Sequence, residues 1–171
     1  AAGPNNITTR QVADRLAEGP LSFEPGTDYE YGMSADVLGA VIEVVTGMKF
    51  SEYLKKTIWE PLGMKDTGFW VPPEKQERLS KVYRSSQGQA VGAWGGNSKG
   101  GKVELFTNCN LGIQADMTKE PAFESGGAGM VSTVDDYMRF VQMLCNKGIL
   151  DGNRILKEET VKYMSQAKLR P

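Results

Sequence analysis

Apolar residues recur at helical spacing in two blocks of this 171-residue chain, one before residue 72 and one after residue 124. The first block predicts a short helix that follows Thr8 and stops at Gly19. It then predicts a helix over residues 35–46, capped by Ser34 and ended by Gly47. The apolar positions of this second helix surround nearly its whole circumference: Val37, Leu38, Val41, Ile42, Val44 and Val45. Such a helix is expected to be buried on several sides.

A third helix is predicted from Ser51 to the residue before Pro61, since proline does not continue a helix. Its apolar stripe comprises Tyr53, Leu54, Ile58 and Trp59. The periodicity then weakens between residues 72 and 124. There the pattern indicates only a short helix at 74–79 and strands at 81–84 and 102–106.

The second block contains the clearest helical pattern of the chain. The S/T-x-x-D spacing within residues 132–136 supplies an N-cap, and Gly148 closes the helix. Its apolar residues recur at three- and four-residue steps: Val134, Tyr137, Met138, Val141, Leu144 and Cys145. Cys145, at an apolar position of this helix, is expected to be a buried thiol. A last helix is predicted to start near Glu158.

Length and composition favour one globular domain over residues 1–171. With 20 Lys+Arg against 21 Asp+Glu and 40% apolar residues, neither disorder nor a nucleic-acid partner is indicated. The sequence contains no apolar run of about 18 residues, so no membrane span is predicted. No export signal is visible either, and the compartment stays open. Cys109 lies in a polar segment, and spacing alone does not decide whether it pairs with Cys145.

Three short motifs match nucleophile or phosphate-binding patterns but lack the context that those patterns need. Gly96 to Gly100 matches G-x-S-x-G around Ser98, yet the chain has no histidine to act as a base. Residues 96–102 match G-x-x-x-x-G-K, but Val103 stands where a Ser or Thr would bind magnesium. Ser165 starts an S-x-x-K match near the end of the chain. We expect surface loops and a polar helix end at these places, and no metal site or cofactor.

The most specific pattern is DYEYGMSADVLG, residues 28–39. On local chemistry alone it is a turn at Pro25-Gly26 followed by tyrosines that pack where a helix starts. The segment nevertheless resembles the serine β-lactamase and penicillin-binding-protein superfamily, in its branch of class C β-lactamases, DD-peptidases and β-lactamase-like carboxylesterases. The resemblance continues through these further residues: Glu43, Thr46-Gly47, residues 61–64, Asp66-Thr67, residues 124–133, Asp135-Asp136 and Phe140.

The resemblance implies a catalytic role for Tyr31, which matches the tyrosine of the family's second motif. That phenol serves as, or assists, the general base and protonates the leaving group. Its ordinary pKa of about 10 must fall by about three units for this work, which requires nearby positive charge. Met33 occupies the position where class C enzymes have an asparagine, and a thioether cannot donate that amide's hydrogen bond. The spacing from Tyr31 to Asp36 is more like that of the esterases. The predicted substrate-binding residues are Met33, Asp36, Gly126 and Gly127.

The expected fold is α+β and predominantly helical, namely the central helical subdomain of the β-lactamase/DD-peptidase fold with a few short strands. The S-x-x-K segment that the family has upstream and its K-T-G-like strand downstream are not found. Trp94-Gly95-Gly96 is interpreted as a chance match to a third esterase motif. The predicted function is a fragment, inactive by itself, of a serine hydrolase that acts through an acyl-enzyme on small-molecule esters, β-lactams or D-amino-acid peptides. The alternative is a non-catalytic binding or interaction module. In either case we expect self-association, with a homodimer as the favoured state.

Overall fold

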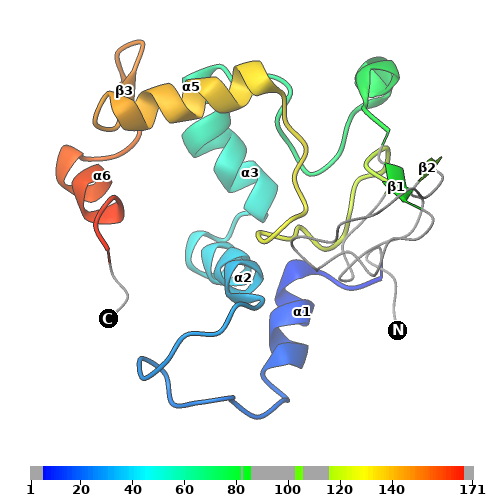
Figure 1. Ribbon diagram of the computed structural model, residues 1–171, viewed down its shortest axis with the longest axis vertical. Helices are drawn as coiled ribbons and strands as arrows, with labels where there is room; N and C mark the ends of the chain where they lie inside the picture. The colour runs from blue at the N-terminus through cyan, green and yellow to red at the C-terminus, as the bar shows by residue number, and fades with distance from the viewer. Residues whose placement is uncertain (1–5, 82, 86–102, 106–115, 168–171) are drawn as a thin grey trace.

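The computed structural model describes residues 6–81, 83–85, 103–105 and 116–167. It is helix-rich, as predicted, with short strands only (Figure 1). The helices are α1 (Thr9–Leu16), α2 (Ser34–Thr46), α3 (Phe50–Leu54), η1 (Lys55–Trp59), α4 (Glu60–Leu62), η2 (Pro73–Arg78), α5 (Val134–Cys145) and α6 (Glu158–Met164). Two antiparallel pairs are formed by β1 (Tyr83–Ser85) with β2 (Val103–Leu105) and by β3 (Ile149–Leu150) with β4 (Asn153–Arg154). In the described part of the chain, no helix is long and apolar enough to cross a membrane.

Most predicted elements are present, but one helix cap differs from the prediction. Thr8 caps α1 through a capping box with Gln11, and Thr133 caps α5 by accepting from the Asp136 amide. Ser34 is the first residue of α2 and not its cap, because Met33 occupies the cap position without a side-chain hydrogen bond. Helix α5 ends at Cys145, and Gly148 closes its last turn as predicted, because the Gly148 amide donates to the Met143 carbonyl at 2.9 Å while Lys147 takes the left-handed conformation with φ 60°.

The third predicted helix continues through Pro61, contrary to expectation. α3 passes into η1, a turn with π-type hydrogen bonds, and then into α4, which ends at Gly63 with φ 67°. Proline removes one N–H donor from a helix, and the π-type turn just before Pro61 marks where the hydrogen-bond ladder is rearranged. The Met64 amide then closes the helix by donating to the Trp59 carbonyl at 2.8 Å.

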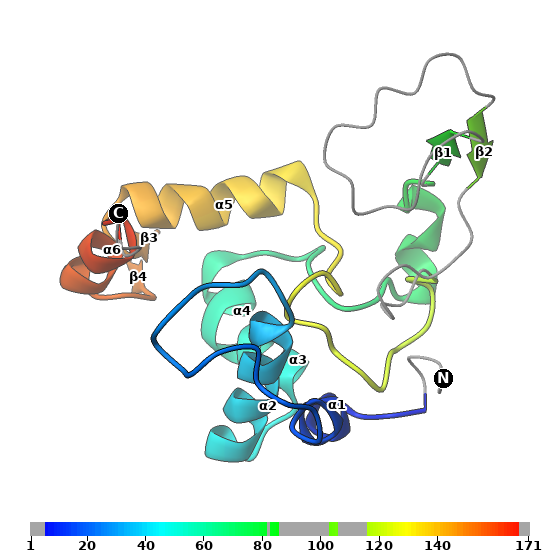
Figure 2. The same cartoon turned by 60° about the horizontal axis from the view of Figure 1, so that its bottom comes forward.

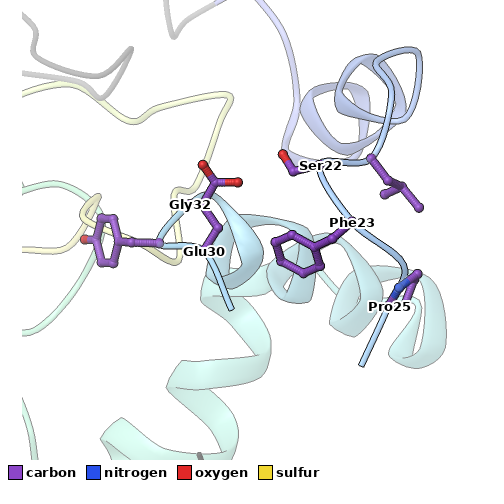
Figure 3. A pocket seen from close by; sticks show the side chains of 7 residues that line it. Ser22, Phe23, Pro25, Glu30 and Gly32 are labelled. Carbon is purple, nitrogen blue, oxygen red and sulfur yellow. The ribbon is translucent and has the colours of Figure 1, made fainter. Parts of the chain in front are cut away.

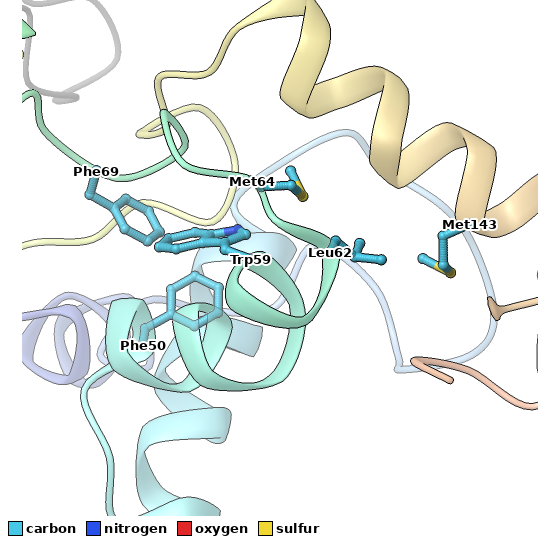
Figure 4. Packing of buried hydrophobic residues seen from close by; sticks show 6 residues of the cluster. All are labelled: Phe50, Trp59, Leu62, Met64, Phe69 and Met143. Atoms are coloured by element: carbon cyan, nitrogen blue, oxygen red, sulfur yellow. The ribbon is translucent and has the colours of Figure 1, made fainter. Parts of the chain in front are cut away.

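The hydrophobic core joins α3–α4 to α5 (Figure 4). Its buried members are Phe50, Trp59, Leu62, Met64, Phe69 and Met143. The Phe69 ring lies 5.4 Å from that of Phe50 and 6.2 Å from that of Trp59, both tilted, which is a favourable aromatic geometry. Met143 reaches this cluster from α5, so it connects the second block of the chain to the first.

The buried side of α5 differs from the apolar stripe in its sequence. Asp136 and Met143 face inward, whereas Val134, Tyr137, Met138 and Cys145 are exposed. The prediction that Cys145 is buried was therefore wrong. On the inner side of α5, Met143 enters the core and the Arg139 side chain donates to the carbonyl of Leu62.

Helix α2 is buried on one side only, so the expectation of burial on several sides was wrong. It packs against α1 and α3 (Figure 2) through Gly39 and Ala40, and a Cβ on Gly39 would stand 3.2 Å from the Phe50 ring. Ile42 also packs against the core. The following apolar side chains of α2 are 38% to 79% exposed: Val37, Leu38, Val41, Val44 and Val45. The described residues leave this surface uncovered.

A buried carboxylate on α5 holds the segment that follows α4. Asp136 accepts hydrogen bonds from the amides of Lys65 at 3.2 Å and Asp66 at 2.7 Å, and from the Thr67 hydroxyl at 2.8 Å. Beside it, Gly68 and Val131 exchange two backbone hydrogen bonds of 3.0 and 2.8 Å. The start of α5 is therefore fixed to residues 65–68 by polar contacts as well as by the core.

We predict that Asp136→Ala lowers the free energy of unfolding by about 1–3 kcal/mol, because it leaves buried N–H donors without an acceptor. Asp135→Ala is the matched control, since Asp135 lies in the same first turn but is exposed. Asp135→Ala should lower the free energy of unfolding by at most about 1 kcal/mol. Urea unfolding of both variants measures the difference, and equal losses would contradict the role given to Asp136.

Candidate active site around Tyr31

Tyr31 lies in the loop between α1 and α2 and is 86% exposed. The loop turns at Pro25-Gly26, as predicted: Gly26 has φ 84°, and the Thr27 amide donates to the Glu24 carbonyl at 3.1 Å. Because the loop doubles back, its two arms line one shallow hollow of about 270 Å³ (Figure 3). The lining residues are Leu21, Ser22, Phe23, Pro25, Glu30, Tyr31 and Gly32.

The hollow is mainly apolar and contains no cation among its lining residues. Glu30 supplies a carboxylate and Ser22 a hydroxyl, but neither Lys nor Arg lines the surface. A phenol that takes or gives a proton near neutral pH needs positive charge close by. The described residues of this hollow therefore present the phenol without the cation that its predicted role requires.

Met33 connects the Tyr31 loop to α2. Its carbonyl accepts from the amides of Asp36 at 3.0 Å and Val37 at 3.1 Å, which starts the helix. Its side chain is partly exposed, two residues along the chain from Tyr31. The thioether is thus available at the surface of the loop but offers no hydrogen-bond donor.

Asp36, Gly126 and Gly127 come together, although they are far apart in the sequence. The Ser125 hydroxyl donates to Asp36 Oδ1 at 2.5 Å, and the Gly127 amide reaches the same oxygen at 3.3 Å. A Cβ on Gly126 would stand 2.4 Å from the Ala35 carbonyl oxygen, so only glycine permits this approach to α2. The prediction that these residues bind substrate stays a prediction.

Glu124, next to Ser125, is joined to two helices, α1 and α3, and no role was predicted for it from the sequence. Its side chain is 1% exposed, accepts from the Ser51 amide at 2.6 Å and pairs with Lys49 at 2.9 Å. Its own amide donates to the Thr9 hydroxyl at 3.0 Å. The sequence does show a glutamate and a serine directly before a pair of glycines, which could have drawn attention to this segment. Their hydrogen-bond partners could not be found from it, because Ser51 lies 73 residues from Glu124 and Asp36 lies 89 residues from Ser125.

Lys49 is a structural cation and not a candidate base. Burial acts to lower the pKa of its ammonium group, but the hydrogen bonds and charges of Glu120 and Glu124 raise that pKa above its ordinary value. Lys49 therefore stays protonated near neutral pH. Its contacts with Glu120 at 2.7 Å and Glu124 hold the start of α3 to the 120–124 segment.

The short motif matches of the sequence add no reactive group within the described residues. Ser165 donates to the Val161 carbonyl of its own helix at 2.9 Å, at the C-terminal end of α6. Ser98, the 96–102 match, residues 94–96, Cys109 and Lys168 lie outside the described residues. Where side chains are described, no group of three or more His, Cys, Asp or Glu could hold a metal ion.

The chain belongs to the β-lactamase family, whose family model matches residues 1–171. It is similar to esterase EstB of Burkholderia gladioli, with 35% identity over 140 residues, covering 80% of this chain and 34% of EstB. Lovastatin esterase of Penicillium rubens is 33% identical over 171 residues, covering 99% of this chain and 38% of that protein. The chain thus spans little more than a third of the length of these curated relatives.

Two solved structures support the same family assignment. EstCE1, described as a hydrolase with promiscuous acyltransferase activity, superposes with a TM-score of 0.73 at 26% identity, covering 96% of this chain and 42% of that chain. D-amino acid amidase from Ochrobactrum anthropi, complexed with D-phenylalanine, gives 0.60 at 26% identity, covering 90% and 39%. The predicted superfamily is therefore confirmed.

Proposed function

We propose that this chain forms the tyrosine-bearing part of a hydrolase that transfers acyl groups through an acyl-enzyme, with Tyr31 as its catalytic phenol. The observation that carries the proposal is the position of Tyr31, exposed beside an apolar hollow and just before a helix anchored at its first turn. Residues 1–171 would form one domain, the central helical subdomain of the family's fold. The similarity to esterases supports this assignment.

The proposed chemistry needs a serine and a cation besides the phenol. A serine oxygen attacks the substrate carbonyl while its proton passes to a base, and the leaving group departs after taking a proton. Tyr31 would relay these protons, because its hydroxyl can both accept and donate. We propose that the nucleophile and the cation come from outside the described residues, since Ser22, the serine in the hollow, has no lysine beside it.

The lining of the hollow favours neutral esters as the substrate class. Leu21, Phe23 and Pro25 offer apolar surface to an acyl chain, while the Glu30 carboxylate repels anions. β-Lactams and D-alanyl peptides carry a carboxylate, so this arrangement disfavours them. Met33 adds to the preference, because a missing amide donor costs a bound β-lactam about 0.5–1.5 kcal/mol.

The chain by itself is expected to form no acyl-enzyme. With a fluorophosphonate probe, nitrocefin and p-nitrophenyl butyrate, we expect neither labelling nor turnover above background. Ser22 has no lysine among the residues of the hollow, Ser165 donates to a backbone carbonyl, and Ser125, which donates to the Asp36 carboxylate, is only 2% exposed. Stoichiometric labelling of a single serine, Ser98 or Ser165 above all, would contradict the proposal and identify the nucleophile within the chain.

The role of Tyr31 is tested in a chimera in which this chain replaces the matching segment of EstB. We expect the folded chimera to hydrolyse p-nitrophenyl butyrate faster than nitrocefin. Tyr31→Phe should then lower kcat by about 10²- to 10⁴-fold, the usual contribution of a general acid or base. Steady-state kinetics of the two chimeras give the comparison.

Tyr29→Phe is the matched control for this chimera. Tyr29 lies two residues away in the same loop and is also exposed, so the change removes the same hydroxyl from the same surface. It should leave kcat within about twofold, as expected for a surface change. If Tyr31→Phe and Tyr29→Phe had equal effects, Tyr31 would not be the catalytic phenol.

The alternative, an interaction module, is favoured by the uncovered surface of α2. The two acidic residues of α2 are engaged elsewhere: Asp36 is buried, and Glu43 accepts from the Phe50 amide at 3.1 Å. Two copies of such a surface can meet without repulsion, and a contact between identical surfaces closes as a symmetric dimer.

Light scattering coupled to size exclusion is therefore expected to show a dimer at tens of micromolar. Val41→Glu, in the middle of the α2 surface, should give a monomer, because the contact would bury an unpaired charge. Val134→Glu is the control, since this exposed valine belongs to α5. A wild-type monomer of 18.7 kDa without dye-binding apolar surface would contradict self-association.

A further inference from the structure

The hydrogen bond between Ser125 and Asp36 is buried and joins the two family segments that carry the predicted site. Ser125 is 2% and Asp36 6% exposed, so water does not compete for their 2.5 Å contact. The Ser125 oxygen also accepts from the Ala128 amide at 3.2 Å, and its carbonyl accepts from the Gly129 amide at 3.0 Å. Ser125 is thus held by its own turn while it holds Asp36.

Asp36 is in turn bound to the end of the Tyr31 loop. Its amide donates to the Met33 carbonyl at 3.0 Å, and it lies five positions after the phenol. Among the described residues, no side chain between Tyr31 and Asp36 forms a hydrogen bond that would fix the loop to another element, and Met33 caps α2 through its backbone only. The attachment at Asp36 is therefore the nearest described side-chain anchor on the C-terminal side of the loop.

We propose that Asp36 is a positioning residue: through its bond from Ser125 it fixes the first turn of α2, and hence the Tyr31 loop, to the 124–129 segment. The inference rests on the proposed function of Tyr31. Gly127 packs closely against the carboxylate, because a Cβ on Gly127 would stand 3.0 Å from Asp36 Oδ2. The other oxygen, Oδ1, takes the Ser125 and Gly127 donors.

The activity-independent test uses the chain as described and backbone NMR. In Ser125→Ala and in Asp36→Ala, exchange of the Asp36 and Val37 amides should rise by about tenfold, because the first turn of α2 opens more often. The heteronuclear NOE of the Tyr31 and Gly32 amides should fall. The double variant should exchange no faster than Asp36→Ala alone, since Asp36→Ala already removes the bond from Ser125. Full additivity would overturn the proposal.

Thr67→Val is the matched control. It removes a hydroxyl that donates to another buried carboxylate, Asp136, at 2.8 Å in the same molecule. It should lower global stability as Ser125→Ala does, yet leave the Asp36 and Val37 amides and the Tyr31 loop unchanged under conditions where all variants are folded. Equal changes in both variants would mean that Ser125 has a general structural role, and would overturn the proposal.

The EstB chimera links positioning to catalysis. Ser125→Ala should lower kcat by about tenfold with KM within twofold, because the phenol is misplaced while the apolar hollow remains. Asp36→Asn, which keeps an acceptor oxygen, should recover most of the loss that Asp36→Ala causes. If amide exchange rises in the Ser125 and Asp36 variants but Tyr31→Phe leaves kcat of the chimera unchanged, only the proposed function is refuted. If Tyr31→Phe lowers kcat but amide exchange does not change in those variants, only the positioning role is refuted.

Discussion

Buried carboxylates that accept hydrogen bonds from distant segments are the contacts on which the rest of this structure depends. Asp36, Glu124 and Asp136 are almost completely buried, and each has donors from another part of the chain. A buried carboxylate is strongly unfavourable unless its oxygens are satisfied, so the three positions are specific to the native arrangement. They supplement a small apolar core that reaches from α3 to α5 and leaves one side of α2 exposed.

These contacts also explain how the candidate site is assembled. Glu124 ties α1 and α3 to the segment that precedes the glycine pair, and Ser125, the next residue, ties the first turn of α2 to it. The Tyr31 loop is consequently held at both ends, by α1 and by α2, although its middle is exposed. Such a loop can present a phenol at a defined place while remaining open to other groups. In this account the glycines serve close packing, because the α2 backbone leaves no room for a side chain at Gly126.

Local signals in the sequence predicted most helices, while the long-range contacts were beyond its reach. The start of α1 after Thr8 and the end of α2 at Gly47 depend on neighbouring residues only, and both were predicted correctly. The inward side of α5 depends on Asp136 and its amide donors some 70 residues earlier, so the apolar stripe misled the prediction. For the site, the resemblance singled out Tyr31 and Asp36. The partner of Asp36 could not be found from spacing, because Ser125 lies 89 residues further on.

The most direct test of the carboxylate contacts is amide exchange at Ser51 and Asp66, which donate to Glu124 and Asp136. Neither amide lies in the middle of a long regular helix, so high protection there reports the carboxylate bonds. The account predicts that both exchange only through global unfolding, with the same free energy that denaturant unfolding gives. Exchange as fast as that of the amides of the exposed residues Leu21, Ser22 and Glu24 would contradict it.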